Sequence, residues 1–537
     1  MDDVLVVGSG PTGAMAAEEL VARGLRVAMI DYGEDDPVLR ARVPDLPFSE
    51  LRRKDPAQRG YFLGDQLEGV PRSGTRVGAQ LTPPRQFVSR AAECLLPVQS
   101  ADFHPMQSLA LGGLGAAWGT ACFTYSAKEC ARAGLDPVAI AASYPDVVRG
   151  AGISGPKQDQ CADLWWSGVT GQLPLDLDTN AGSILDAYQR DVAGWLRRGF
   201  ALGRVPLAIN SVPHQGRDAN PYFDTDFYGE ARQSAYRPRY TVERLKRAAN
   251  FRYIPDCLAL SFREDAGSAE LTCLRGGERV VFRGRRLLLC AGALGSARLA
   301  LASLPLADRV TGLLCSPYVY YPTLNLRMLG RPAADRRHSM AQLMAIFGGL
   351  ETPERTCAMQ LYSYRSLLLF KLVKEMPLAP WAGMLMARAM ADALAIFGVF
   401  FPDEAGPGKT LRLGASTASA APAIHIAYNP TSAQAAIQRT LEAGLRRCFL
   451  RLGCVPLDRV DPGKAGSIHY AGTIPRKNAV NPRFHTLADG RLGGCERVFV
   501  GDSSSWNWLP CKGPTFTAMA AARVVAGHIA ASIGERP

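Results

Sequence analysis

The segment that most constrains the fold is residues 4–31, which read VLVVGSGPTGAMAAEELVARGLRVAMID. Its apolar runs and their spacing predict a buried strand, a glycine-rich turn, an amphipathic helix and a second strand. In such a unit Gly8 allows the tight turn, Gly10 lets a pyrophosphate approach the backbone, and Gly13 lets the helix pack closely on the strand.

The start of the predicted helix, at Pro11 and Thr12, presents free N–H groups and a partial positive charge to the phosphates. Asp31 follows the second strand, where a carboxylate accepts hydrogen bonds from the adenosine ribose. The glycines, helix, strand and acid occur in the order that a dinucleotide-binding unit requires. We therefore expect this unit at the start of the chain.

Two later segments predict strands of the same sheet. Residues 286–299, RLLLCAGALGSARL, form a buried strand and a turn at Ala291 and Gly292 that leads into a helix. Residues 497–502, RVFVGD, form another strand that ends at Asp502, which could bind a flavin ribityl or pyrophosphate group. Because an NAD enzyme normally completes its sheet nearby, these distant returns favour a discontinuous FAD domain.

Five sequence blocks together resemble the glucose–methanol–choline (GMC) oxidoreductases, and within them the pyranose oxidase-like branch. The blocks are GSGPTG at the amino terminus, ALGGLGAAWG at 110–119, LLLCAGALGSARL at 287–299, SIHYAGT at 467–473 and VFVGDSSSWNWLPCKGPTFTAMAAA at 498–522.

The resemblance implies an α/β fold in which a Rossmann-like FAD-binding domain, discontinuous in sequence, carries an inserted α+β substrate domain with an antiparallel sheet and helices. We expect the FAD-binding domain at 1–45, 85–130, 240–305 and 465–537. The substrate or cap domain is expected at 46–84, 131–239 and 306–464.

The resemblance also implies the oxidation of an alcohol, in which hydride passes from the carbinol carbon to flavin N5 while a base accepts the hydroxyl proton. His469 stands where the family keeps its catalytic histidine, in an H-x-x-G-T pattern. Imidazole suits this role because it titrates near physiological pH. The alternative is that His469 only hydrogen-bonds its own loop.

The chain departs from the branch at its flavin loop. Where the branch places a histidine that is covalently bonded to the flavin, this chain has Ala117, followed by Trp118. FAD is therefore expected to bind noncovalently. The small residues Gly112, Gly113 and Gly115 would still let the loop pass close to the isoalloxazine ring.

A second departure lies before the last helix. Related oxidases place Asn or His at the position of Gly513, where the side chain helps to hold the substrate hydroxyl. Asn507 or Lys512 could replace that side chain. Pro514 and Thr515 open a helix whose free N–H groups and dipole would stabilise negative charge on the reduced flavin.

The apolar stretch 367–401 contains Pro377, Pro380 and the pair Arg388 and Asp392, which argues against a transmembrane span. It could cover a sheet as a helix, form a greasy substrate channel, or lie as an interfacial face against a bilayer. Residues 46–84, rich in Arg, Pro and Gly, predict an irregular connector or lid over the flavin.

Composition narrows the partners. The net charge of +12 comes from scattered residues with no nucleic-acid motif, so we expect no nucleic-acid partner. Thirteen cysteines without C-x-x-C spacing favour a reducing cytoplasm. No ligand cluster predicts a metal, and the sequence leaves the oligomeric state open.

These observations predict a cytoplasmic FAD-dependent alcohol oxidase or dehydrogenase. Its substrate is expected to be a small molecule, apolar or glycosylated, as in natural product biosynthesis. The alternative, motivated by Gly513, is a flavin-containing lyase, isomerase or cyclase that uses the same pocket without net redox change.

Overall fold

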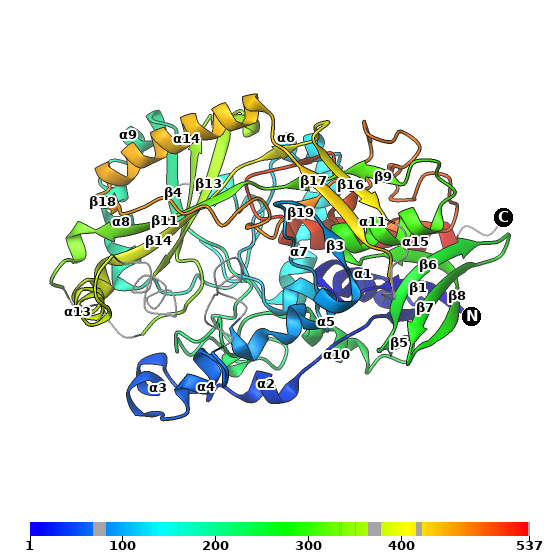
Figure 1. The fold of residues 1–537 in the computed structure, drawn as a ribbon, viewed down its shortest axis with the longest axis horizontal. Coiled ribbons are helices and arrows are strands. Elements are labelled where there is room, and N and C mark those ends of the chain that lie inside the picture. The colour runs from blue at the N-terminus through cyan, green and yellow to red at the C-terminus, as the bar shows by residue number, and fades with distance from the viewer. Residues whose placement is uncertain are drawn as a thin grey trace.

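A computed structural model describes residues 1–67, 82–157, 159, 162–331, 333, 336–349, 351–363, 377–414 and 421–534. Figure 1 shows a mostly parallel sheet near the two termini and a separate antiparallel sheet at the opposite end of the molecule. The predicted class, a Rossmann-like domain with an inserted α+β domain, is confirmed.

The first sheet joins segments from both ends and the middle of the chain. Its parallel strands are β1 (Asp2–Val7), β2 (Val27–Ile30), β5 (Phe251–Ile254), β8 (Glu278–Leu289) and β20 (Val498–Val500). β8 pairs in parallel with both β1 and β20, which places Leu288 beside Val6 and Phe499. The predicted return of distant strands to one sheet is thus confirmed.

Antiparallel strands β6 (Leu258–Glu264) and β7 (Ala269–Arg275) extend this sheet beyond β8. The helices α1 (Pro11–Ala22), α10 (Pro238–Leu245) and α15 (Thr515–Gly534) pack on one face through small and branched apolar side chains. The other face packs against α11 (Gly292–Ser303). Both faces are therefore covered, as its continuous apolar strands require.

A small four-stranded sheet packs in the same core as α11. Its strands, in spatial order, are β3 (Val98–Gln99), β17 (Ile424–Tyr428), β16 (Lys409–Leu413) and β9 (Val310–Gly312). Two further two-stranded pairs are β10 (Leu314–Cys315) with β19 (Tyr470–Ala471), and β15 (Asp403–Glu404) with β21 (Trp508–Leu509).

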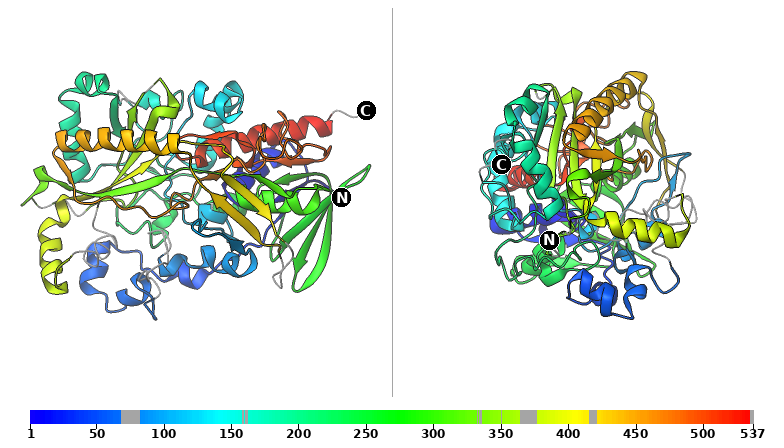
Figure 2. Two further views of the ribbon diagram at one scale, coloured as in Figure 1. Left: turned by 45° about the horizontal axis from the view of Figure 1, so that its top comes forward. Right: turned by 90° about the vertical axis from the view of Figure 1, so that its left-hand side faces the viewer.

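The large antiparallel sheet has six strands. In spatial order they are β18 (Cys454–Pro456), β11 (Tyr318–Asn325), β14 (Leu394–Phe400), β13 (Thr356–Ser363), β12 (Leu343–Gly348) and β4 (Phe200–Arg204). The long helix α14 (Ser432–Arg451) lies across one face, where Phe449 packs against Phe397 (Figures 1 and 2). The opposite face is left to line the cavity described below.

The remaining helices complete the two domains. They are α2 (Pro37–Ala41), α3 (Phe48–Lys54), α4 (Gln58–Phe62), α5 (Phe87–Leu95), α6 (Ala127–Ala133), α7 (Pro137–Ala151), α8 (Thr179–Gln189), α9 (Val192–Arg197) and α13 (Pro380–Met390). The short helices α3 and α4 correct the expectation of a wholly irregular connector at 46–84, of which residues 68–81 lie outside the described part.

The apolar stretch 367–401 is not one helix that covers a sheet. Its residues 394–400 form the fully buried strand β14, and only residues 380–390 are helical, as α13. Because β14 is buried on both faces, it shows no alternation, and a short apolar run of this kind does not distinguish strand from helix. Residues 367–376 lie outside the described part.

Within the described residues, one helix, α15, has the length and hydropathy of a membrane span. Most of its apolar side chains pack against α1, α7 and the parallel sheet. A helix that packs in the interior of a protein in this way has the same apolar composition as a membrane span.

Candidate functional site

The glycines of the first turn make two different close contacts. Gly8 has φ +97°, and a Cβ at this position would lie 2.7 Å from the carbonyl oxygen of Cys290. A Cβ at Gly13 would lie 2.0 Å from the carbonyl oxygen of Gly8. A Cβ at Gly10, in contrast, would meet no protein atom within 4 Å, so the protein leaves open space in front of this residue.

The amino terminus of α1 faces this open space. Gly10 is its N-cap, and no side chain of the described residues caps the free N–H groups of the first turn. Such a terminus is suited to bind an anion such as a phosphate.

Asp31 is held at the end of β2 by two hydroxyls that sequence reasoning missed. Ser9 Oγ donates to Asp31 Oδ2, and Tyr253 Oη donates to the same oxygen at 3.2 Å. Burial raises the pKa of Asp31 to about 6, and the two hydrogen bonds act in the opposite direction. Both of these bonds are to Oδ2, and the carboxylate lines the cavity, where it can accept from a ribose.

The second glycine-rich loop packs directly on the first. Gly112 has φ +95°, and its N–H donates to Ser9 Oγ at 2.8 Å. A Cβ at Gly113 would approach Gly10 Cα to 3.3 Å. Trp118 is fixed through Nε1, which donates to the carbonyl of Tyr236 at 2.9 Å.

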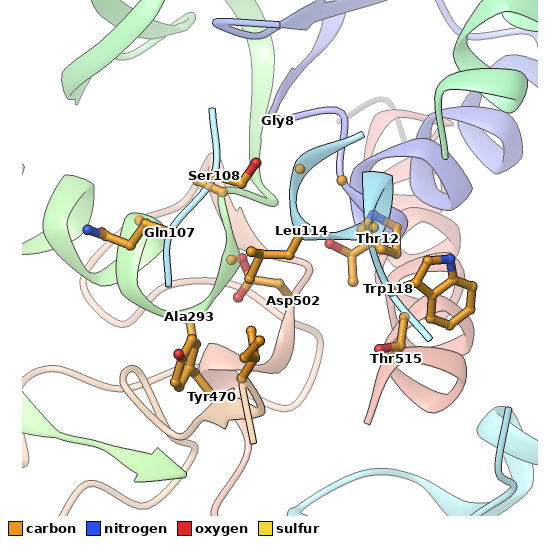
Figure 3. A pocket seen from close by; sticks show the side chains of 18 of the residues that line it. Gly8, Thr12, Gln107, Ser108, Leu114, Trp118, Ala293, Tyr470, Asp502 and Thr515 are labelled. Atoms are coloured by element: carbon orange, nitrogen blue, oxygen red, sulfur yellow. The ribbon is translucent and has the colours of Figure 1, made fainter. Parts of the chain in front are cut away.

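A single cavity of about 350 Å³ brings most of the predicted site residues together. Figure 3 shows that Thr12, Trp118 and Thr515 lie on one side of it, and Gln107 and Ser108 on another. The predicted residues that line it are Gly8, Gly10, Pro11, Thr12, Asp31, Gly113, Gly115, Ala117, Trp118, Ala291, Gly292, His469, Asp502, Gly513, Pro514 and Thr515.

Two predicted residues, Gly13 and Gly112, do not line the cavity. Both instead support its wall: Gly13 lets α1 approach β1, and Gly112 joins the two glycine loops. The short spacing of these glycines in sequence does not reveal which of them face the cavity.

Asp502 follows β20 and is almost fully buried. Its Oδ2 accepts from Ser296 Oγ at 2.6 Å, and its Oδ1 accepts from the backbone N–H of Ser504 at 3.0 Å. Burial raises the pKa of Asp502, while these hydrogen bonds lower it. The bond to Ser296 joins the turn after β20 to α11, so two walls of the cavity are held together.

His469 enters the cavity on a strained loop. The preceding residue, Ile468, has φ +60°, which is a rare conformation for a β-branched side chain. The imidazole stacks on Phe400, with 5.0 Å between ring centroids. Burial lowers the pKa of His469 to about 4, and its Nδ1 has no hydrogen-bond partner among the described residues.

A buried ion pair lies behind the histidine loop. Lys409 Nζ and Asp403 Oδ1 form a pair in which both side chains are almost completely excluded from solvent. Asp403 Oδ2 also accepts from the N–H of Cys315 at 2.9 Å and from Tyr428 Oη at 2.7 Å. Since Cys315 pairs with Tyr470 across β10 and β19, this network supports the strand next to His469.

The start of α15 faces His469. A Cβ at Gly513 would lie 3.6 Å from Phe123 Cδ2 and 3.7 Å from His469 Cε1. Helix α15 begins at Thr515, so Pro514 precedes its first turn, and the Pro514 carbonyl accepts from the N–H of Ala518.

Neither candidate replacement for the missing side chain at 513 faces the cavity. Lys512 is buried and forms an ion pair with Glu129 at 2.6 Å. Asn507 Oδ1 accepts from the N–H of Lys477 at 2.9 Å, away from the cavity.

The antiparallel sheet supplies lining residues that sequence reasoning missed. Gln360 and Tyr362 of β13 and Phe400 of β14 line the same cavity as His469. The alternation of polar and apolar residues in AMQLY at 358–362 was a signal for a strand with one polar face. Which other residues lie opposite this face of the strand depends on the fold and cannot be read from the segment itself.

These features fit a dinucleotide with a flavin. The open space before Gly10, the uncapped start of α1 and the buried Asp31 can hold a pyrophosphate and an adenosine ribose. Trp118, His469 and the start of α15 surround the far part of the same cavity.

Comparisons with known proteins agree with this fit. Residues 1–43 match the family model of an FAD-binding domain. The paromamine 6'-oxidase of Streptomyces fradiae is 31% identical over 221 residues, a match that covers 40% of this chain and 32% of that protein. The match therefore spans about a third of the relative's length.

Solved structures show the same fold over nearly the whole chain. Pyridoxine 4-oxidase from Mesorbium loti has a TM-score of 0.57 and 14% identity, over 98% of this chain and 99% of that one. A formate oxidase variant from Aspergillus oryzae RIB40 has a TM-score of 0.61 and 12% identity, over 99% of both chains. An FAD-dependent oxidoreductase from Chaetomium thermophilum has a TM-score of 0.58 and 12% identity, over 99% and 100%. These findings support FAD as the cofactor.

Proposed function

We propose that this protein, which has the fold of the FAD-dependent glucose–methanol–choline oxidoreductases, oxidises an alcohol group of a small molecule with His469 as the base. The observation that carries the proposal is a buried imidazole, whose Nδ1 has no hydrogen-bond partner among the described residues, in the cavity that also contains the dinucleotide cradle. The similarity to paromamine 6'-oxidase supports an alcohol as the reacting group.

The cofactor would be held by the chain's backbone more than by its side chains. Gly10 and the start of α1 would receive the pyrophosphate, and Asp31 the ribose. We propose that FAD binds noncovalently, since Ala117 offers no nucleophile at the position that carries a histidine in the pyranose oxidase-like branch. When bound, FAD supplies an acceptor for the hydride that leaves the carbinol carbon.

His469 is suited to accept the hydroxyl proton because its ring is neutral. With a pKa of about 4, the imidazole carries a lone pair throughout the physiological pH range. This pKa is lower than the near-neutral value expected from the sequence, and a pKa near the operating pH is the one that most favours a base. No described residue fixes Nδ1, so the tautomer is free to adapt to the bound alcohol. The stacked Phe400 limits the orientations of the ring and excludes water from one of its faces.

The start of α15 would favour negative charge at its end of the cavity. Its first N–H groups have no intrahelical acceptors, and the helix dipole adds a partial positive charge. Pro514, Thr515 and Ala518 line the cavity, so this helix end lies at the wall and not behind it. This helix end would stabilise the negative charge that builds up on an electron acceptor.

The alternative is a reaction without net redox change in the same pocket. Gly513 favours it, because the side chain that would help to hold a substrate hydroxyl is missing.

We also propose a cytoplasmic location, supported by the twelve described cysteines, all of which are free thiols.

The test is to add an alcohol to the purified holoprotein under anaerobic conditions. Reduction of the flavin is measured as the loss of its absorbance near 450 nm. Pyridoxine, paromamine and benzyl alcohol are suitable first alcohols. Reduction by an alcohol supports oxidation; product formation while the flavin stays oxidised supports the alternative.

The role of His469 is tested in His469→Ala, with His425→Ala, an exposed histidine on β17, as the matched control. We expect His469→Ala to retain FAD and to lose at least a hundredfold in the rate of bleaching. An unchanged rate in a flavin-loaded variant would exclude His469 as the base.

A further inference from the structure

Two neutral polar side chains of the antiparallel sheet face the cavity beside His469. Gln360 and Tyr362 are two residues apart on β13 and therefore project from the same face of the sheet. Gln360 pairs in register with Gly398 of β14, and Phe400 lies two residues beyond Gly398. The face that carries Phe400 to His469 thus also carries Gln360 and Tyr362 into the cavity.

The amide of Gln360 is oriented by its neighbour. Tyr362 Oη donates to Gln360 Oε1 at 2.7 Å, so the oxygen side of the amide is occupied. The printed bond of the Gln360 side chain is to its oxygen, and the residue lines the cavity although only 5% of it is exposed. An amide has two N–H donors, so the Nε2 group is available to donate to a ligand in the cavity.

Thr120 adds an unpartnered hydroxyl to the same region. It lines the cavity, is completely buried, and its Oγ1 has no partner among the described residues. Its φ of +59° is a rare conformation for a β-branched residue. A Cβ at the neighbouring Gly119 would lie 3.9 Å from Tyr362 Oη, so the loop and β13 are adjacent.

This part of the cavity contains aromatic rings but no charge. The charged side chains among the described lining residues are Asp31, Arg298 and Asp502, and all three belong to the turns or helix at the edge of the parallel sheet. Phe400 lies on the same face of the sheet as Gln360, and Phe123 and Trp118 line the same cavity. A cationic or anionic substrate group would have no described counter-charge there.

We propose that Gln360, Tyr362 and Thr120 form a neutral hydrogen-bonding subsite for an oxygen substituent of the substrate, and that the substrate is an uncharged alcohol with a planar ring. The subsite takes over the orienting role that the side chain at position 513 has in related oxidases. This inference rests on the proposed function for the reaction, but the binding that it predicts does not require turnover.

The test is the binding of three isosteric probes to the oxidised holoprotein. Binding is measured from the change in flavin absorbance. Benzamide carries a neutral carbonyl, benzoate a negative charge and benzamidinium a positive charge in a planar group on the same ring. We expect benzamide to bind at least tenfold more tightly than either ion. Tighter binding of either ion, or no saturable binding of benzamide, would overturn the proposal.

Three variants assign the binding to the subsite. Gln360→Leu, Tyr362→Phe and Thr120→Val should each weaken benzamide about threefold to tenfold, as expected for one lost hydrogen bond. Ser363→Ala is the matched control, because its buried hydroxyl is also unpartnered among the described residues but does not line the cavity. If Gln360→Leu fails to bind FAD, the other two variants carry the test.

Benzamide affinity that is unchanged in the flavin-loaded variants would overturn the subsite. If no alcohol reduces the flavin while benzamide binding still depends on these residues, the proposed reaction fails and the subsite stands. If alcohols reduce the flavin but benzamide affinity is the same in all variants, the reaction stands and the subsite fails.

Discussion

The substitution Gly10→Ala separates the cofactor cradle from the fold that carries it. Gly10 has φ −58° and ψ 179°, which alanine adopts without strain, and a Cβ there meets no protein atom within 4 Å. Alanine restricts the unfolded chain more than glycine does, so we expect the apoprotein to be unchanged or stabilised by about 0.4–1 kcal/mol. The added methyl group occupies only the space assigned to the pyrophosphate.

The expected cost appears in cofactor binding. Overpacking by one methyl group in a close-fitting site costs about 1–3 kcal/mol, which corresponds to about a fivefold to 150-fold weaker Kd for FAD. Fluorescence titration of the apoprotein with FAD measures this loss, and thermal unfolding followed by circular dichroism measures apoprotein stability. Both are required, because a destabilised apoprotein would weaken FAD binding for a different reason.

Gly13→Ala is the matched comparison. Its Cβ would lie 2.0 Å from the Gly8 carbonyl oxygen, far inside the 3.4 Å at which ordinary van der Waals contact begins. Helix α1 would have to move away from β1, so the apoprotein itself should lose about 1–3 kcal/mol. The reasoning is refuted if Gly10→Ala binds FAD with wild-type affinity, or if it unfolds the apoprotein as much as Gly13→Ala does.

Three further predictions concern the site and its support. Lys409→Met leaves the Asp403 carboxylate buried without its partner and should destabilise the protein by about 3–5 kcal/mol in thermal or urea unfolding; a loss under 1 kcal/mol would mean that solvent reaches the pair. Gly513→Asn should fit, because a Cβ there makes only ordinary contacts, and it should raise the rate of alcohol-dependent bleaching about threefold to tenfold if a missing hydrogen bond limits the reaction. For His469, the folded pKa of about 4 lies below the ordinary value of 6.5, so the unfolded chain takes up the proton first as the pH falls. Stability is therefore lost between about pH 6.5 and pH 4, by up to about 3 kcal/mol, and His469→Gln should show a smaller drop in Tm over that window; equal drops would contradict the neutral, buried imidazole.

The parallel sheet could be predicted from sequence because its signals are local. β1, β20 and the last three residues of β8 (287–289) are apolar runs that precede a glycine turn, and such runs are typical of strands that are buried on both faces. Asp31 could be placed for the same reason, since it directly follows such a strand.

The walls of the cavity depend on contacts that the sequence does not contain. Gln360 and Tyr362 line the cavity that contains His469 because β13 pairs with β14, whose Phe400 stacks on that histidine. The strand β14 could not be recognised within the long apolar stretch 367–401. It is buried on both faces, so its sequence lacks the alternation that identifies a strand. Lys512 was a candidate to replace the side chain missing at 513, yet its charge pairs with the buried Glu129 on α6. In each case a partner distant in sequence decides the outcome.

We propose that the two glycine loops, the histidine loop and the start of α15 surround one flavin. A crystal structure of the protein with FAD bound tests this arrangement directly. We expect the pyrophosphate at Gly10 and the isoalloxazine ring in the cavity between Trp118, His469 and Thr515. A protein that binds no FAD, or a bound flavin that has no contact with the part of the cavity around His469, would contradict it.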